Sequence, residues 1–500
     1  MTRAVFQRKD LTTTAGRHLD QKLRDEGFTL DPHDTSTLER LQHDVQRIAC
    51  DMDDPERQPP MIWTGIPFPS PENTAVHTNG HYSLVISVGG TKTGHALMRL
   101  VDGEPRLLDP PHGEVCGSRI ATLKKGLVFP TPTPDSVSDG FAMIDRIVEV
   151  IAERLESVPA VVQRCEAVLL SWGFAHHVFR SSETVLGGVT ARNGRMQKDQ
   201  TPFTRELEGQ DIGELFRKSI RKHLEVELPL TIANDGVAAL HYFLSAENLV
   251  EYRQIGLFIN GTGANFALAE PYVVRPQGVV SQNGEQYEPI RLRAAPTRRA
   301  GDSIELYFVN YECGTIALNE TRTRYDVDSL CPLEENALSG GNAFEQQFRE
   351  VVSDVSPDLY ARVLANHVEH RDTGAPAGPE VSRLAAGGPA AMEEVFPGAN
   401  LDRSEAELAC LAALATVERS ALHAALVLAA AGLRTGFGSG TVPDLLALEG
   451  SVWRAPGYQK LVRNYWEQLA KPAILNVEFD HEPSYDASLI GPLHLAARHR

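Results

Sequence analysis

Two short stretches place glycines between apolar runs that we expect to be strands. The first, Ser83–Met98, reads SLVISVGGTKTGHALM, and the second, Ile255–Ala269, reads IGLFINGTGANFALA. A tight glycine turn lets the backbone approach a ligand closely and points N–H groups at it, which suits phosphate oxygens. Taken singly, each is more often only a turn. Two turns of one plan suggest duplicated halves that could clamp one nucleotide. The turn residues are Gly89, Gly90, Thr91, Gly261, Thr262 and Gly263.

Acidic residues stand where predicted strands end. Asp235 follows the apolar run LTIAN and precedes a predicted helix, so its carboxylate would lie where ligands gather in α/β folds. An aspartate there can also be an ordinary N-cap. Glu312 lies with Asn310 in FVNYECG, and Glu345 lies in GGNAFEQQF. Carboxylates and carboxamides can grip vicinal hydroxyls through paired hydrogen bonds, although each is more often a solvated surface group.

Several other kinds of site are not indicated. The P-loop motif, G-x-x-x-x-G-K followed by Ser or Thr, is missing from the sequence, and the G-F-G-S-G at Gly436–Gly440 lacks the strand-then-helix context of a dinucleotide site. We interpret the latter as a loop. The six cysteines are scattered, with no spacing typical of a zinc site or a disulfide framework.

Charge and hydropathy limit the partners. With 66 acidic and 48 basic residues, the formal net charge of −18 disfavours binding to nucleic acid or to anionic membranes. No basic-then-apolar signal begins the sequence, and its most apolar stretch, Ser420–Leu433, is shorter than the roughly 20 residues that span a bilayer. We therefore expect a soluble, cytoplasmic protein.

At 500 residues the chain is long enough for at least two domains. Helical spacing in the first 60 residues predicts an appended helical segment before a proline-rich connector, and helices and strands alternate after it. Ser404 and Glu407 predict a capping box before a long core helix rich in alanine and leucine. The other predicted elements are strands over Ser83–Val88, Ala96–Val101, Ala167–Ser171 and Leu230–Ala233, and helices over Phe141–Leu155, Asp211–Val226 and Val237–Leu244.

From about residue 60 to its end, the chain resembles the eukaryotic-type hexokinase family of the actin-like ATPase superfamily. SVGGTKT resembles the first phosphate loop of that family, L-D-L-G-G-T-N-F-R, IGLFINGTGAN the second, and LLSWG the segment that supplies a sugar-contacting serine. IANDGVAAL is similar to V-N-D-T-V-G-T, VNYECG to I-N-x-E-W-G, and GGNAFEQQF to G-K-Q-x-F-E-K-M. LALEGSVWRAPGY resembles the adenosine-side V-D-G-S-L-Y-x-x-x-P, and DASLIGPLHLAA loosely resembles D-G-S-G-K-G-A-A-L.

The resemblance implies an α/β chain with the two-lobed actin-like ATPase (hexokinase/ribonuclease H-like) fold and a ligand cleft between the lobes. It implies a helical segment and connector over residues 1–77, a small lobe over 78–208 with 476–500, and a large lobe over 209–475. Sugar binding would swing the lobes together and exclude water. The implied reaction is phosphorylation of a sugar hydroxyl by ATP with Mg²⁺.

The matched motifs also imply roles for single residues. Asp235 falls on the catalytic base, and Lys198 in RMQKDQ matches the lysine of W-T-K-G-F, although the loop around it is longer. The implied sugar ligands are Ser171, Asn234, Asn310, Glu312 and Glu345. The implied nucleotide-binding residues are the six turn residues named above with Lys92, Gly450 and Ser451.

The chain departs from the family mostly on the nucleotide side. Ser87 stands where the family has the aspartate that holds magnesium, usually through water. A serine hydroxyl can hydrogen-bond such a water but brings no negative charge, so it should hold the cation less firmly. The other departures are Gly94 for an arginine, Ala264 for the second threonine of G-T-G-T, Glu449 for an aspartate, and Gly236 for the threonine after the base.

Two functions remain open at this stage. The first is an active kinase for a sugar or polyol, with glucose as the default and an amino sugar, another hexose or a cyclitol as alternatives. The second is a catalytically weakened sugar-binding or regulatory protein. Asp235 favours the kinase because a pure binder needs no base, whereas Ser87 favours the binder. His176 and His177, just after the Ser171 segment, could contact an altered substrate, but adjacent histidines are more often structural. We expect a monomer or a homodimer.

Overall fold

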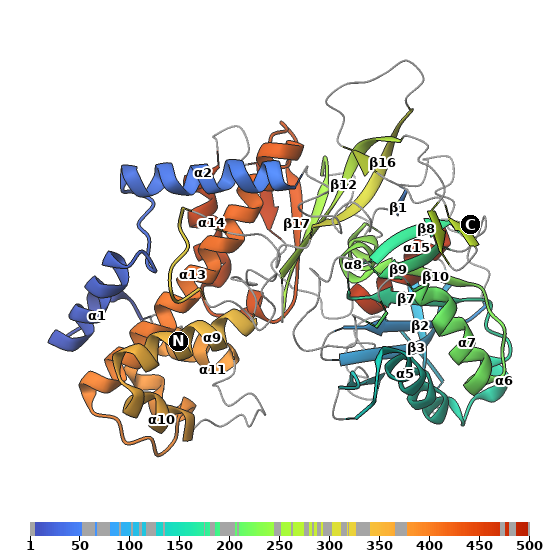
Figure 1. Ribbon diagram of the computed structural model, residues 1–500, viewed down its shortest axis with the longest axis horizontal. Helices are drawn as coiled ribbons and strands as arrows, with labels where there is room; N and C mark the ends of the chain where they lie inside the picture. The colour runs from blue at the N-terminus through green and yellow to red at the C-terminus, as the bar shows by residue number, and fades with distance from the viewer. Residues whose placement is uncertain are drawn as a thin grey trace.

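The computed structural model describes most of the chain in segments. These are residues 6–52, 66–67, 81–89, 92–101, 104–109, 113–116, 127–133, 136–174, 176–180, 186–190, 206–207, 210–244, 252–261, 264–274, 280–282, 285–287, 292–293, 303–311, 318, 320–326, 341–365, 378–470, 476–479 and 487–498. Figure 1 shows two groups of elements, with a helical group on the left and a sheet flanked by helices on the right.

The sheet on the right of Figure 1 is built around three parallel strands, β2, β7 and β10. Its order is β10 (Leu230–Asn234), β7 (Val168–Trp172), β2 (Ser83–Val88), β3 (Lys92–Val101), β4 (Glu104–Asp109) and β5 (Gly113–Cys116), with β6 (Val128–Pro130) paired to β3. Alternate residues of β2 face opposite ways, as a strand requires: Leu84 and Ile86 join one apolar cluster and Val85 another. Helices α5 (Gly140–Leu155) and α7 (Ile212–Leu224) supply the first cluster, and α15 (Ala487–Arg498) supplies the second.

The other large sheet repeats this plan. Its order is β1 (Ile66–Pro67), β16 (Ser303–Tyr311), β12 (Ala264–Val274), β11 (Ile255–Asn260), β17 (Asp444–Glu449) and β18 (Val477–Phe479), with β15 (Leu292–Arg293) paired to β12. β11 is antiparallel to β12 and parallel to β17, just as β2 is antiparallel to β3 and parallel to β7. The two glycine turns therefore occupy equivalent places, which confirms the duplicated plan expected from the sequence.

Helix α13 (Arg403–Thr435) is the centre of the helical group in Figure 1. It packs against α1 (Thr14–Asp25), α2 (Thr35–Asp51), α9 (Gly341–Val355), α11 (Gly378–Gly387) and α14 (Tyr458–Leu469). Its 33 residues make it much longer than the apolar stretch singled out in the sequence, and by length and composition alone it could cross a membrane. Here 94% of its most apolar 18-residue stretch is buried inside the protein, as expected of a core helix.

The start of α13 corrects a prediction. Asp402, rather than Ser404, is the N-cap: its side chain accepts the Glu405 N–H at 2.9 Å, and the Glu405 side chain accepts the Asp402 N–H at 3.0 Å. The capping box lies two residues earlier than expected because the helix begins at Arg403. Glu407 is buried instead and accepts hydrogen bonds from the N–H and hydroxyl groups of Thr12 and Thr13. Burial alone would raise the pKa of Glu407, but these hydrogen bonds outweigh it and lower the pKa to about 2.

The N-terminal helices are anchored through that carboxylate and through apolar contacts. The predicted helix through Leu41 and Ile48 is α2, and both residues are completely buried in the same apolar cluster as α13.

The sheet of β2 and β7 also includes β10, which lies beyond residue 208, where the small lobe was expected to end. The expected lobe boundaries stay a prediction.

Helix α8 (Asp235–Phe243) packs against strands of both large sheets and against α15. The α15 contact needs a glycine: a Cβ on Gly491 would lie 1.6 Å from the Ala238 carbonyl oxygen. With any other residue at position 491, α15 could not approach the α8 backbone so closely.

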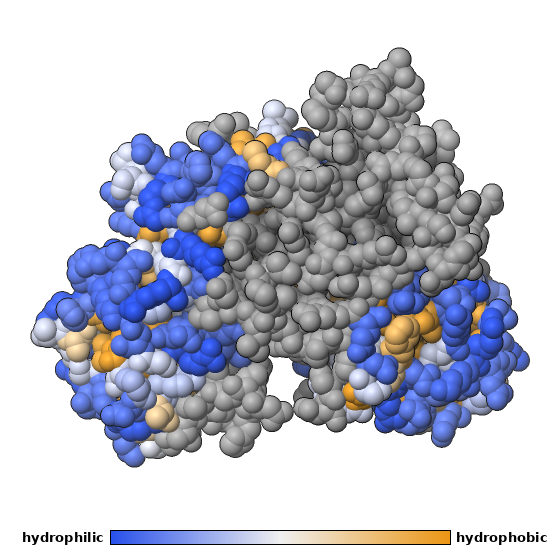
Figure 2. Space-filling view, in the orientation of Figure 1, coloured by the Kyte–Doolittle hydropathy of each residue, from blue (hydrophilic) through white to orange (hydrophobic). Residues whose placement is uncertain are grey.

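Most of the described surface in Figure 2 is hydrophilic, and the large apolar side chains exposed among the described residues are Phe141, Leu433 and Val442.

Candidate functional site

The carboxyl ends of β2, β7 and β10 meet at one edge of their sheet. Ser87 of β2 pairs with Ser171 of β7, and Trp172 of β7 pairs with Asn234 of β10. In open α/β sheets, ligands bind beyond the carboxyl ends of parallel strands. The register therefore brings Ser87, Ser171 and Asn234, three residues singled out in the sequence, to one place.

The turn from β10 into α8 fixes the next residue, Asp235. Asn234 is the N-cap of α8, because its Oδ1 atom accepts the Gly236 N–H at 2.9 Å. The ordinary capping role that an aspartate could have had here thus belongs to its neighbour. Asp235 is half-buried, and its Oδ1 atom accepts the same N–H at 2.8 Å. This bond sets the orientation of the carboxylate.

The other oxygen of Asp235, Oδ2, faces the first glycine turn. A Cβ on Gly173 would lie 3.0 Å from Asp235 Oδ2, 2.8 Å from the Val88 carbonyl oxygen and 3.3 Å from the Gly89 Cα atom. The Gly173 N–H donates to the Val88 carbonyl at 2.7 Å, so the ends of β2 and β7 are held together. The carboxylate, Gly173 and the first turn are consequently immediate neighbours.

The first turn has its own supports. The Gly89 N–H donates to the carbonyl of Lys92, an exposed residue at the start of β3, at 2.9 Å. The Thr131 hydroxyl lies 2.8 Å from the Gly89 carbonyl oxygen and 3.0 Å from the Thr93 hydroxyl. Sequence reasoning did not identify Gly173 or Thr131. A glycine directly after a strand end was the available signal for Gly173, whereas Thr131 is distant in sequence and gave none.

Asn310 brings the second sheet to the same helix end. It lies on β16, is completely buried, and approaches so closely that a Cβ on Gly236 would lie 2.4 Å from its Oδ1 atom. The glycine that replaces the family threonine at position 236 is therefore what leaves room for Asn310. Asn234, Asp235 and Asn310 form one group drawn from both sheets.

Two buried polar atoms of this site have no hydrogen-bond partner among the described residues. They are the Ser171 hydroxyl and the Asn234 side-chain nitrogen, on residues with no exposed surface. A buried polar group without a partner costs about 1–3 kcal/mol. Such a cost is typical of a site whose polar groups are completed by a ligand.

The second glycine turn lies beside the segment that resembles the adenosine side. Gly450 has φ of 103°, and a Cβ on it would lie 2.3 Å from the Asn260 carbonyl oxygen and 2.9 Å from the Gly261 nitrogen. Only glycine fits there, because the backbone is left-handed and the space is closed. The exposed Ser451 follows at the start of a short 3₁₀ helix. The buried Asn260 side chain donates to the Tyr458 hydroxyl at 2.9 Å, which ties the turn to α14.

Glu345 lies in the first turns of α9 and is buried. Its Oε1 atom accepts the backbone N–H of Gly378, at the start of α11, at 3.3 Å. The remaining candidates lie outside the described residues: Gly90, Thr91, Lys198, Thr262, Gly263 and Glu312. G-F-G-S-G forms the loop after α13, as expected, and Asp444 accepts the Gly438 N–H within it.

His176 is buried at the start of β8 (His176–Arg180), which pairs with β9 (Leu186–Thr190). Its Nδ1 atom lies 2.8 Å from the Phe174 carbonyl oxygen, so Nδ1 carries the proton and donates, which leaves Nε2 as an acceptor. Burial lowers the pKa of His176 to about 4, against a smaller opposing effect of that hydrogen bond. The imidazole is thus neutral at neutral pH.

No protein-family model matches the sequence, and no curated protein is similar to it in sequence. The structure, however, is similar to the hexokinase of Schistosoma mansoni solved in complex with glucose. The TM-score is 0.65, with 16% sequence identity over 96% of this chain and 99% of that chain. A second hexokinase crystal structure has a TM-score of 0.61, again at 16% identity over 96% and 99% of the two chains. The similarity confirms the expected two-lobed α/β fold.

We predict that stability falls as the pH is lowered from about 6.5 to about 4. Burial lowers the folded-state pKa of His95, His176 and His423 to about 4, below the unfolded value near 6.5, so the unfolded state binds more protons in this interval. Their contribution is complete above about pH 6.5 and is lost as the pH approaches 4. His176→Gln should reduce the dependence of the free energy of unfolding on pH by up to about 1.4 kcal/mol per pH unit. Urea unfolding at several pH values measures this dependence.

The exposed His81 provides the control, and His81→Gln should leave the slope of the wild type unchanged. Equal slopes in the His176→Gln variant and the wild type would show that His176 is not held neutral by burial.

Proposed function

We propose that this chain, which has the fold of hexokinases, transfers the γ-phosphoryl group of ATP to a hydroxyl of a hexose or a sugar-like substrate. The observation that carries the proposal is the position of Asp235. Its carboxylate lies at the carboxyl ends of three parallel strands, with one oxygen beside Gly173 and the first glycine turn. Structural similarity at 16% identity supports the fold, and the activity is inferred from the site.

Asp235 is the proposed general base. The Gly236 N–H holds its Oδ1 atom, so Oδ2 is directed to the side of the glycine turn, where a phosphate would lie. The sugar hydroxyl gives its proton to Asp235 as its oxygen bonds to the γ-phosphorus. The bond from that phosphorus to the bridging oxygen breaks, and ADP leaves with the electron pair. Phosphoryl transfer needs mainly positioning and charge neutralisation, so one weak base is sufficient.

The sugar side of the site consists of residues that hydrogen-bond hydroxyl groups. Ser171 and Asn234 each have a buried polar atom without a partner among the described residues, and Asn310 lies near Asn234 beside Gly236. Glu312, Glu345 and Lys198 complete the proposed set by resemblance. Glucose is the first substrate to test, since the similar Schistosoma mansoni hexokinase was solved with it. An amino sugar, another hexose or a cyclitol is the alternative, because the loops after Ser171 differ from the family pattern.

The nucleotide side fits ATP at the two glycine turns. Gly450 packs against the Asn260–Gly261 backbone and so fixes the second turn, while a Cβ on Gly261 would meet no atom within 4 Å, which leaves its backbone open to the approach of phosphates. Mg²⁺, bound mainly through the ATP phosphates, would neutralise charge on them. Ser87 is half-buried at the end of β2 and can hold a metal-bound water only through its hydroxyl. No group of three or more potential metal ligands is found among the described residues.

The second candidate function is a sugar-binding or regulatory protein with little turnover. The uncharged Ser87 favours it, because a binder does not need to hold the metal. We propose a cytoplasmic protein, monomeric or dimeric, in either case.

We predict sugar-dependent ADP release from Mg²⁺-ATP, and a fall of at least about 10²-fold in kcat for Asp235→Ala, because general bases contribute about 10²–10⁴-fold. Sugar affinity should change much less, since Asn234 and Ser171 remain. ADP release across hexoses, amino sugars and cyclitols measures turnover, product mass confirms transfer, and tryptophan fluorescence measures sugar binding. An equal loss of kcat and affinity would contradict the role of base.

We predict that Ser87→Asp speeds a latent kinase, since the new carboxylate would help to hold magnesium. The expected result is a lower Mg²⁺ concentration at half-maximal rate, with an unchanged KM for the sugar. Ser87→Asn, which adds bulk without charge, is the matched control. No gain in turnover for Ser87→Asp, together with intact sugar binding, would favour the binding protein.

Two glycine variants should separate the two sides of the site. Gly236→Ala must displace the Asn310 side chain and should raise KM for the sugar about tenfold or more while leaving KM for ATP within about twofold. Gly450→Ala must shift the Asn260–Gly261 backbone, and it should raise KM for ATP about tenfold or more while leaving KM for the sugar within about twofold. Each variant is the control for the other in steady-state kinetics. A rise in both constants for both variants would show that the two places do not act as separate subsites.

A further inference from the structure

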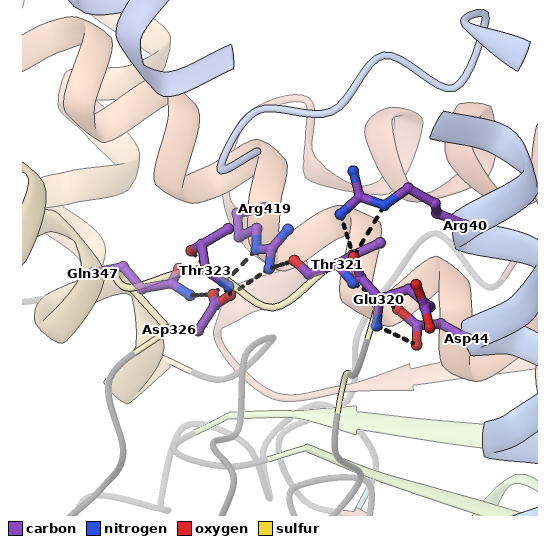
Figure 3. Close-up of polar contacts among 8 residues, drawn as sticks. All are labelled: Arg40, Asp44, Glu320, Thr321, Thr323, Asp326, Gln347 and Arg419. Carbon is purple, nitrogen blue, oxygen red and sulfur yellow. Dashed lines mark hydrogen bonds and ion pairs between the residues drawn. The ribbon is translucent and has the colours of Figure 1, made fainter. Parts of the chain in front are cut away.

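A buried ionic cluster surrounds Asp326 in the helical group. Figure 3 shows its carboxylate facing Thr323, Gln347 and Arg419. Its Oδ1 atom accepts hydrogen bonds from Arg419 Nε and from the Gln347 side chain, each at 3.1 Å. Its Oδ2 atom accepts the Thr323 N–H at 2.7 Å and a second Arg419 nitrogen. Asp326 and Arg419 are only 5% and 2% exposed.

The cluster joins three parts of the chain that are distant in sequence. Asp326 ends the described segment 320–326, Gln347 lies on α9, and Arg419 lies on α13. Arg419 also donates to the Thr321 carbonyl at 2.6 Å. The segment 320–326 is thereby fixed to α13 at two points and to α9 at one.

The same segment is held from its other side by α2. Asp44 accepts the N–H groups of Glu320 and Thr321, each at 3.2 Å, and the Thr321 hydroxyl at 2.7 Å. Arg40 donates to the Glu320 carbonyl, as Figure 3 shows. These contacts place residues 320–321 between α2 and α13.

The position of the cluster along the chain relates it to the sugar side. Segment 320–326 follows the strand that carries Asn310, and α9, which begins at Gly341, carries Glu345 two residues before Gln347. Phe344 and Phe348, around Glu345, are buried in the same apolar cluster as α13. A shift of α9 relative to the segment 320–326 would therefore move Glu345.

Stability alone does not account for such a cluster. A buried ion pair is often no more stabilising than apolar residues of the same volume, and its clearest use is to specify one geometry. Here Arg419 Nη1 and Gln347 Oε1 are buried with no partner among the described residues, which subtracts from stability. What the directional hydrogen bonds provide is a single placement of α9.

We propose that Asp326 and Arg419 are positioning residues, which act through Gln347 to set the first turns of α9 and so the proposed sugar ligand Glu345. The inference deepens the proposed function and rests on it for the role of Glu345. The placement of α9 itself rests only on the contacts described above.

The test uses two variants of the cluster and one control. Asp326→Asn keeps the shape of the side chain but removes its charge, and the milder Gln347→Leu removes only the bond from α9. Glu407→Gln is the matched control, because it weakens a different buried carboxylate, which lies on α13 and binds Thr12 and Thr13 rather than α9. Hydrogen exchange of the unliganded protein, thermal unfolding, and KM for sugar and ATP are measured on all three.

We expect amide exchange in residues 341–350 to speed up at least tenfold in both cluster variants and not in Glu407→Gln. KM for the sugar should rise at least tenfold with KM for ATP within twofold, whereas Glu407→Gln should lower the melting temperature with both constants unchanged. Unchanged exchange in α9, or the same KM rise in Glu407→Gln, would overturn the proposal. If the wild type phosphorylates no substrate, the proposed function fails, and the exchange measurement still decides whether the cluster places α9.

Discussion

The close approach of one neighbouring helix and one asparagine side chain to helix α8 is the constraint on which the rest of the structure depends. Gly491 lets α15 contact the α8 backbone at Ala238, and Gly236 lets Asn310 reach the first turn of α8. Both contacts exclude even a methyl group. As a result α8 touches both sheets and the C-terminal helix, and the carboxylate at its start is held where the two halves of the chain meet.

Of the side chains at the start of α8, one stabilises the helix and another is directed to the candidate site. Asn234 caps α8, so Asp235 is not needed for capping and keeps one oxygen directed to the glycine turn. On the proposed nucleotide side the departures from the hexokinase pattern are at Ser87, Gly94 and Ala264, while Gly450 meets a strict steric requirement. The chain thus has close backbone contacts at Gly450, while the proposed metal side carries an uncharged serine.

Local sequence patterns predicted most helices and strands, but they could not predict contacts between residues that are distant in sequence. Alternating apolar residues and glycines identified β2, β3, β11 and β12, and their pairing confirms the repeated plan. The start of α13 was misplaced because Ser404 and Glu407 fit the capping pattern as well as Asp402 and Glu405 do. Only the fold shows that Glu407 binds the chain 395 residues away. For the same reason no pattern could reveal that Gly236 faces Asn310 or that Gln347 faces Asp326.

The bond between Thr12 and Glu407 has a consequence for how the chain folds during synthesis. The N-terminal helices are made first, but their anchor on α13 emerges 395 residues later. At about 5–20 residues per second, the ribosome takes about 20–80 seconds to add that length. During this time Leu41, Ile48 and the other apolar residues of α1 and α2 cannot pack against α13, which supplies a large part of their apolar cluster. The nascent chain therefore exposes the apolar faces of α1 and α2 to chaperones until α13 has been synthesised.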